Sequence, residues 1–410
     1  MSKDINKNLK IILLSSYFIS SCLACLVGCN KHEDIALENS GSYNFDSENN
    51  LNNNLNKEKY LEIDKIKYEL NHENKTAKII KAEDINGILN LVSEIDYNKN
   101  KYKIIEIGDA AFKDCINLTE ISIPSSVLFI DVASFANCIN LTKVNISKTS
   151  DMRSIGASAF LGCKNLTTIN LPNSLNLIDG EAFSGCSKLS DIIIPENVKA
   201  IGMKTFFNCQ KLNNIKIPGG VRLIGEGAFS GCSSLEKLNL EEGIVSIGQY
   251  AFSGCLALKN INIPNSVLSL NNYAFFGCVA LESIKLGEGL KFISNYLFSG
   301  CLNLNNITIP KNILSINDFA FENCFNLKEV MIENGLNNIC ERAFSGCKSL
   351  TTINIPGSVL KIEESAFSDC LALENVTIPK DRKLYKKDKS LYNLYDEGFK
   401  NGPAYDLYLK

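Results

Sequence analysis

The chain has 410 residues, a formal net charge of −3 and a pI near 5.7, so nothing in its electrostatics favours a nucleic-acid partner. Hydrophobic residues make up 45% of the chain, which supplies material for a core and excludes a wholly disordered protein. The chain has only two histidines, His32 and His72, but sixteen cysteines, so the spacing of the cysteines is the feature to explain.

Residues 1–28 have the pattern of an export signal. Three lysines precede an apolar run over residues 11–28, which is short and interrupted by serines, so a leader fits better than a membrane span. The run ends in Leu-Val-Gly-Cys29, which resembles the lipobox of bacterial lipoproteins. That resemblance implies lipid attachment at Cys29, with Cys22 as a second candidate. A plain leader or a signal anchor is the alternative.

Residues 29–59 are polar and rich in Asn, and few of them have side chains suited to burial. This composition predicts a flexible tether between the lipid and the folded body. Residues 60–103 are expected to form an N-terminal β cap. Within them, Ile66, Tyr68 and Leu70 alternate with polar residues, and residues 76–81 can return after a turn, which predicts a β-hairpin.

An internal repeat dominates residues 104–379. Each of twelve cysteines has a Phe three residues before it, a Leu three residues after it, and aliphatic residues six and eight after it. Every step is 23 residues except the step of 25 between Cys138 and Cys163. The twelve cysteines are Cys115, Cys138, Cys163, Cys186, Cys209, Cys232, Cys255, Cys278, Cys301, Cys324, Cys347 and Cys370.

Each unit is expected to form one strand and one tight turn. The Leu-x-x-Ile-x-Ile segment alternates and predicts a short strand, which a following Pro such as Pro124 often ends. The Ala-Phe-x-x-Cys segment predicts a short helical or 3₁₀ turn with Phe and Cys on one side. The residue before each Cys is Gly, Asn or Asp, types that tolerate a positive φ. Because one unit cannot bury its apolar face alone, the units must stack into a solenoid with a parallel sheet.

The array resembles the BspA-like subfamily of leucine-rich-repeat proteins, which uses a 23-residue unit. The pattern Ile-Gly-x-x-Ala-Phe-x-x-Cys-x-x-Leu-x-x-Ile-x-Ile-Pro carries the resemblance, and residues 224–240 match it, with Glu241 in place of Pro. The resemblance implies a leucine-rich-repeat solenoid (repeat α/β to mainly β) of about twelve units over residues 104–379. It also implies a surface location and attachment to matrix proteins or other cells. No binding residue carries over from the family.

The cysteine ladder is expected to consist of buried free thiols that pack as small hydrophobes. Disulfides between neighbouring units are the first alternative, but parallel Cβ directions disfavour the dihedral angle that they need. A metal site is the second alternative, and no histidine lies in the repeats to support it. Cys340 stands outside the ladder, in the place of the usual Gly, and is expected to be partly exposed.

The strand positions on either side of the first Ile should point outward by alternation, and in leucine-rich repeats generally the strands line the concave face. These positions are polar, mildly basic and without aromatic residues, and only Ile193 and Met331 are plainly apolar. Ordinary soluble strand residues are the alternative interpretation. The candidate ligand face comprises Lys143, Asn145, Asn170, Lys216, Lys237, Asn239, Asn260, Asn262, Lys285 and Thr308.

No catalytic, cofactor or metal site is expected. The segment from Gly225 to Gly231 loosely resembles a phosphate-binding loop, but both glycines occupy ordinary repeat positions. A Ser-His-Asp arrangement would need His32 or His72, which lie outside the repeats. Acidic residues at or after the Pro position are interpreted as a solvated edge. They are Glu241, Glu242, Glu288 and Glu333.

Residues 380–410 carry basic and aromatic residues and are expected to be a C-terminal cap or tail, with contact to nucleic acid or an anionic polymer as the alternative. The sequence therefore predicts a cell-surface binding scaffold that is held to the outer membrane by its lipid. Its expected role is that of an adhesin for protein or glycoprotein ligands, including extracellular matrix. The alternative is a structural envelope lipoprotein with no host ligand.

Overall fold

The computed structural model describes residues 59–147 and 149–377. The predicted signal with Cys29, the tether up to residue 58 and the tail from residue 380 lie outside the described residues. The regular elements of the described part are β-strands joined by turns. In that part of the chain, no helix has the length and apolar character needed to cross a membrane.

One column of parallel strands is formed by the Leu-x-x-Ile-x-Ile segments, as predicted. Equivalent residues of successive units pair directly, for example Ile215 with Leu238. Their first Ile points inward and is buried, while its neighbours point outward, because alternate strand residues face opposite sides. The column comprises β7 (Leu118–Ile123), β9 (Lys143–Ile146), β11 (Thr168–Ile169), β14 (Asn214–Ile217), β16 (Lys237–Leu240), β18 (Asn260–Asn262), β20 (Ser283–Lys285), β22 (Asn306–Ile309), β24 (Glu329–Ile332), β26 (Thr352–Asn354) and β28 (Asn375–Thr377).

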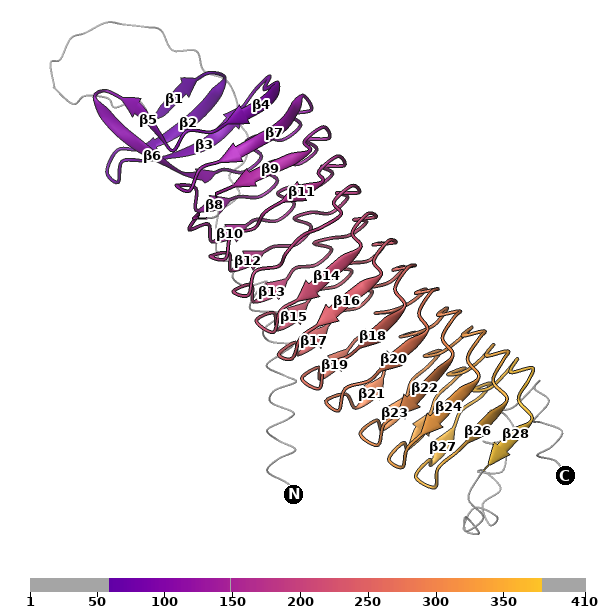
Figure 1. Cartoon of the computed structure of the whole chain (residues 1–410). Helices are drawn as coiled ribbons and strands as arrows, with labels where there is room; N and C mark the ends of the chain where they lie inside the picture. Colours follow the sequence, from indigo (N-terminus) through magenta and orange to yellow (C-terminus); the bar gives the residue numbers. More distant parts are fainter. Residues whose placement is uncertain (1–58, 148, 378–410) are drawn as a thin grey trace, which may run out of the picture. The chain divides into compact units, whose positions relative to one another are not determined.

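A second column of parallel strands was not expected from the sequence. It is formed by two-residue strands that end at the Ile or Leu before the turn, and Figure 1 shows the two columns along the array. The prediction of a single sheet is therefore incomplete, because a two-residue strand has no alternation to reveal it. The column comprises β8 (Phe129–Ile130), β10 (Ser154–Ile155), β12 (Leu177–Ile178), β13 (Ala200–Ile201), β15 (Leu223–Ile224), β17 (Ser246–Ile247), β19 (Ser269–Leu270), β21 (Phe292–Ile293), β23 (Ser315–Ile316), β25 (Asn338–Ile339) and β27 (Lys361–Ile362).

The segment between the two columns is a run of tight turns, and the predicted helical or 3₁₀ turn is wrong. In the first unit the amides of Ala110, Phe112 and Asp114 donate to carbonyls of the next unit, so every second amide of the turn forms a hydrogen bond between units. In a helix these amides would donate to carbonyls of the same segment. The residue before each Cys has a positive φ, as predicted, and so does the residue five before it, which the sequence did not reveal.

The core is a pair of ladders that run through the stack. The Phe rings three residues before the cysteines lie stacked, with ring centroids 5.0 Å apart for Phe112 and Phe135 and 5.8 Å apart for Phe275 and Phe298. All twelve ladder thiols are free and buried, as predicted. From the second unit on, each thiol donates to the carbonyl of the Phe one unit earlier; the Sγ–O distance is 3.2 Å for Cys232. This hydrogen bond explains why a thiol, and not a methyl group, occupies the position.

The N-terminal cap contains the predicted hairpin. β2 (Ile66–Asn71) pairs antiparallel with β3 (Thr76–Ala82). The cap also joins both columns, because β4 (Gly87–Asn90) pairs with β7 and β6 (Asn100–Ile107) pairs with β8. The remaining cap strands are β1 (Tyr60–Ile63), which pairs with β2, and β5 (Glu94–Tyr97), which pairs with β6. The first unit therefore has a covered apolar end.

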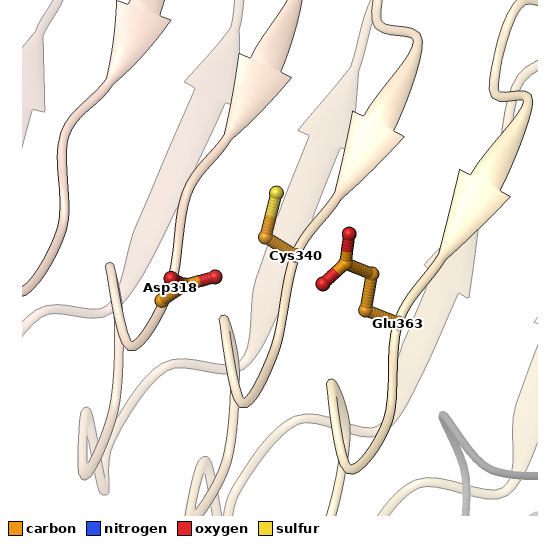
Figure 2. A group of neighbouring side chains, drawn as sticks. All are labelled: Asp318, Cys340 and Glu363. Carbon is orange, nitrogen blue, oxygen red and sulfur yellow. The ribbon is translucent and has the colours of Figure 1, made fainter.

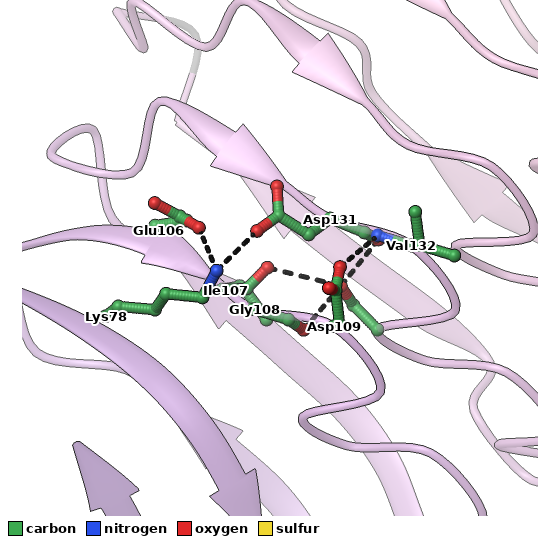
Figure 3. Close-up of polar contacts among 8 residues, drawn as sticks. Lys78, Glu106, Ile107, Gly108, Asp109, Asp131 and Val132 are labelled. Carbon is green, nitrogen blue, oxygen red and sulfur yellow. Dashed lines mark hydrogen bonds and ion pairs between the residues drawn. The ribbon is translucent and has the colours of Figure 1, made fainter. Parts of the chain in front are cut away.

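A cluster of charges connects the cap to the array (Figure 3). Lys78 of β3 donates to Asp131 with an Nζ–Oδ2 distance of 3.0 Å and pairs with Glu106 of β6. Burial and a hydrogen bond with Glu106 raise the pKa of Asp131 to about 6, although Lys78 opposes the shift. Burial lowers the pKa of Lys78, but its hydrogen bonds to the two carboxylates outweigh burial and raise it overall. The two carboxyl groups thus compete for one lysine.

Candidate binding surfaces

The predicted ligand face is accessible. Nine of the ten residues singled out from the sequence have exposed side chains, and Asn145 is half-buried. They lie on β9, β11, β14, β16, β18, β20 and β22, or directly after them, at the outward positions. We call the column from β7 to β28 the long-strand column and its outward side, which carries these residues, the long-strand face. The column is divided into three sheets, one ending at β11, one spanning β14 to β20, and one starting at β22, so the face is interrupted twice.

A hollow of about 740 Å³ lies where this column is first interrupted. One wall is formed by residues 191–194, which are not part of a strand, and the other by β14, β16 and β18. Five predicted face residues line it: Lys216, Lys237, Asn239, Asn260 and Asn262. Ile193 also lines it and is 77% exposed, although it is a large apolar side chain. The interruption therefore brings polar side chains of the predicted face together with one exposed apolar anchor, Ile193.

The two lysines in the hollow differ in their surroundings. Lys216 Nζ lies 2.9 Å from Glu241 and 3.5 Å from Glu196, and the hydrogen bond with Glu241 raises its pKa. The same bond, together with the amide of Gly219, lowers the pKa of Glu241. Among the described residues no carboxylate lies within ion-pair distance of Lys237. Lys237 is therefore better placed than Lys216 to meet a partner's carboxylate.

Three of the four acidic residues interpreted as a solvated edge have structural partners. Glu242 accepts hydrogen bonds from the amides of Asn265 and Ser266 at 3.0 and 2.9 Å. Glu333 accepts from the amide of Lys311 at 3.0 Å. Glu242 and Glu333 are exposed and Glu241 is half-buried, in keeping with a solvated edge, and these carboxylates also hold the loops of neighbouring units together.

A second surface carries a ladder of aromatic rings that sequence reasoning missed. The residues five before the cysteine in four successive units are Tyr250, Tyr273, Tyr296 and Phe319. Their ring centroids lie 4.7, 4.6 and 4.5 Å apart, nearly parallel. The guanidinium of Arg342, in the next unit, lies 5.7 Å from the Phe319 ring centre. We call these four rings the surface ladder. Reading the repeat column by column would have found it, because four aromatic residues recur at one position.

A cluster at the C-terminal end of the array combines a thiol with two carboxylates (Figure 2). Ligand atoms of Asp318, Cys340 and Glu363 lie within 4.8 Å of one another, on the turns after β23, β25 and β27. Lys361 already pairs with Glu363 at 2.7 Å, and burial raises the pKa of the Cys340 thiol. A protonated thiol and a paired carboxylate are poor metal ligands, so we assign no ion to this cluster. Cys340 is half-buried, as predicted.

The fold defined by these features is a leucine-rich-repeat solenoid, with parallel strands in register and a ladder of buried Phe and Cys. The chain belongs to the BspA-type leucine-rich-repeat family. The model of the BspA type leucine rich repeat region matches residues 92–212, 153–282, 199–324 and 269–393, which together cover well over half of the chain. The family expected from the sequence is thereby confirmed.

Solved structures with the same repeat show the extent of the likeness. A leucine-rich repeat protein from Bacteroides ovatus is 28% identical, with a TM-score of 0.54, and the match covers 78% of this chain and 88% of that one. A leucine rich cell surface protein from Faecalibacterium prausnitzii is 27% identical over 82% of this chain and 97% of its own, with a TM-score of 0.44. A leucine rich repeat protein from T. pallidum is 31% identical, with a TM-score of 0.44, and the match covers 47% of this chain and 88% of that one. None of the curated proteins searched matches the chain.

Proposed function

We propose that the protein is a cell-surface adhesin that binds a protein or glycoprotein ligand, such as an extracellular-matrix protein, through its long-strand face. The observation that carries the proposal is the hollow beside β14, β16 and β18, where exposed amides and Lys237 surround the exposed Ile193. An apolar side chain in a polar rim is the usual composition of a binding hot spot. Leucine-rich repeats are binding scaffolds, so we propose no catalytic activity and no cofactor.

The proposed location is the outer surface of the cell, with the chain held by a lipid on Cys29. The support for the location is the family membership and the description of the F. prausnitzii relative as a cell surface protein. The support for the anchor is the Leu-Val-Gly-Cys29 pattern after an apolar run. A tether of about thirty polar residues would let the folded body reach a ligand at a distance from the membrane.

The test is binding of the protein from Asn30 to Lys410 to immobilised fibronectin and fibrinogen. The first variant changes Lys143, Lys237 and Lys285 to Glu and leaves the ion-paired Lys216 in place. The second is Ile193→Asp, which alters an exposed side chain and should leave the melting temperature unchanged. A matched control changes Lys199, Lys211 and Lys291 to Glu, since these exposed lysines lie outside the long-strand face.

We expect saturable binding that both face variants weaken by at least about ten-fold and that the control retains. Binding that all variants retain would place the ligand on another surface and contradict the role of the long-strand face. The absence of saturable binding to either matrix protein would favour the structural envelope role. Digestion of intact cells with protease separates the locations, because a surface adhesin is removed and a periplasmic protein is protected.

A further inference from the structure

The surface ladder ends beside a residue without a side chain. In the unit before Tyr250 the equivalent position is Gly227, whose φ is 60°. The other eleven residues of this column all carry side chains, with φ between 52° and 60°. Residue 227 therefore has the same backbone geometry as the four ring-bearing positions that follow it in the chain, but it has no side chain.

The two end rings of the surface ladder are consequently different. At one end the guanidinium of Arg342 covers the face of Phe319. At the other end, none of the described rings stacks on the face of Tyr250 directed toward Gly227, and Tyr250 is 36% exposed. The next side chain in the column is Lys204, two repeat steps away from Tyr250, or about 9–10 Å along the stack. That separation is the room that one planar ring needs between two neighbours.

The aliphatic part of the Lys204 side chain lies over Gly227. Its Cγ lies 3.3 Å from the point that a Cβ at residue 227 would occupy, and Ser230 Cβ lies 4.0 Å from the same point. A lysine stem is flexible, so an incoming group can displace it at small cost. The position therefore offers a ring face and a movable cover.

We propose that the face of Tyr250 above Gly227 is a docking position for an aromatic side chain of a protein partner, which extends the surface ladder by one ring. An aromatic ring is favoured because the ladder already repeats at 4.5–4.7 Å with rings as its members. A cationic side chain is disfavoured, because Lys204 already brings a positive charge to this position. The docking position lies at the turns and is separate from the long-strand face.

The test uses N-acetyl-L-tryptophanamide as the ligand and detects it by saturation-transfer NMR. The chain contains no Trp, so every indole signal belongs to the added ligand. We expect saturable transfer to the indole protons. Gly227→Tyr should weaken binding by at least about ten-fold, because its own ring would then occupy the position. Tyr250→Ala should have the same effect, because it removes the ring face.

Both variants are compatible with the backbone. Tyr occupies this column three times and Ala occupies it at residues 110 and 133, all with positive φ. Circular dichroism and thermal melting verify that each variant is folded, and Tyr250→Ala alone decides the question should Gly227→Tyr not fold. Lys237→Glu, on the long-strand face, serves as the control and should bind the indole unchanged. This control also separates failure of this proposal from failure of the adhesin proposal.

Three results would overturn the proposal. The first is no saturable transfer to the indole. The second is transfer that Gly227→Tyr and Tyr250→Ala leave unchanged, which would place the indole elsewhere. The third is stronger transfer to N-acetyl-L-argininamide or to methyl α-glucopyranoside, abolished by the same two variants, which would assign the position to a cation or to a sugar.

Discussion

The buried thiol ladder makes a quantitative prediction about chemical reactivity. Burial raises the pKa of Cys232 to about 12, so at pH 8 only about one in 10⁴ of these thiols is the reactive thiolate. A free cysteine with a pKa near 8.5 is about one-quarter thiolate at the same pH. Ionisation alone therefore slows the reaction of Cys232 about 2,000-fold, and burial against the Phe ladder slows it further.

The measurement is labelling with a maleimide followed by mass spectrometry of the protein from Asn30 to Lys410. Three of the sixteen cysteines, Cys22, Cys25 and Cys29, precede this segment, which leaves thirteen. In the native protein we expect Cys340 to react first, since it is the half-buried one, and Cys115 to follow slowly. In urea all thirteen should react. The Cys340→Ser variant should lose the native label.

Two outcomes would refute this reasoning. Fewer than thirteen labels in urea without a reductant would mean that some ladder cysteines form disulfides. Native labelling of several ladder cysteines at the rate of Cys340 would mean that the stack opens readily, so that burial does not protect its thiols.

Three further predictions concern stability. Phe229→Ala should lower the free energy of unfolding by about 3–5 kcal/mol in urea titrations, because the ring is fully buried between two stacked rings; a loss below about 1 kcal/mol would contradict the core assignment. Gly231→Ala should cost about 1 kcal/mol or more in the same titration, because φ is 76° and a Cβ would meet the Asn208 side chain. Asp131→Asn should raise the melting temperature at pH 7.5 and leave it nearly unchanged at pH 4. The pKa of this carboxyl group is raised from 3.8 to about 6 in the folded protein, so its ionisation reduces stability as pH rises through about 4–6; equal shifts at both pH values would contradict this assignment.

Much of the site description also followed from the sequence. Alternation about the inward Ile correctly placed Lys237, Asn239 and Asn260 on the solvent side of their strands, because the side-chain period of a strand is two. The hollow itself was not predictable. It depends on the interruption of strand pairing at residues 191–194, whose Asp-Ile-Ile-Ile sequence keeps the two inward aliphatic residues of its neighbours and differs at the outward Ile193. Its ligand is a proposal, and so are the lipid on Cys29 and the adhesin role.

The surface ladder was missed for a different reason. Reading along the chain, Tyr250 and Tyr273 are separated by 23 residues, and in eight of the twelve units the equivalent position is not aromatic, so the repeat consensus does not mark it. Only stacking brings them to 4.7 Å, and only the positive φ of their column turns all four side chains toward solvent in parallel. Local sequence patterns do not report contacts between units.

The sequence by itself determined the family, the repeat length, the inward Phe, Cys and Leu positions, and the parallel stacking, because a unit of 23 residues can bury its apolar face only against a copy of itself. It also determined that the ladder cysteines remain thiols, since equivalent positions in a stack share one Cβ direction. Only the tertiary structure decided that the turns carry left-handed residues in place of helix, that a second column of short strands exists, and that Lys78 joins the cap to the array. These features arise from hydrogen bonds and ion pairs between different units, whose partners lie 22 or more residues apart in the chain.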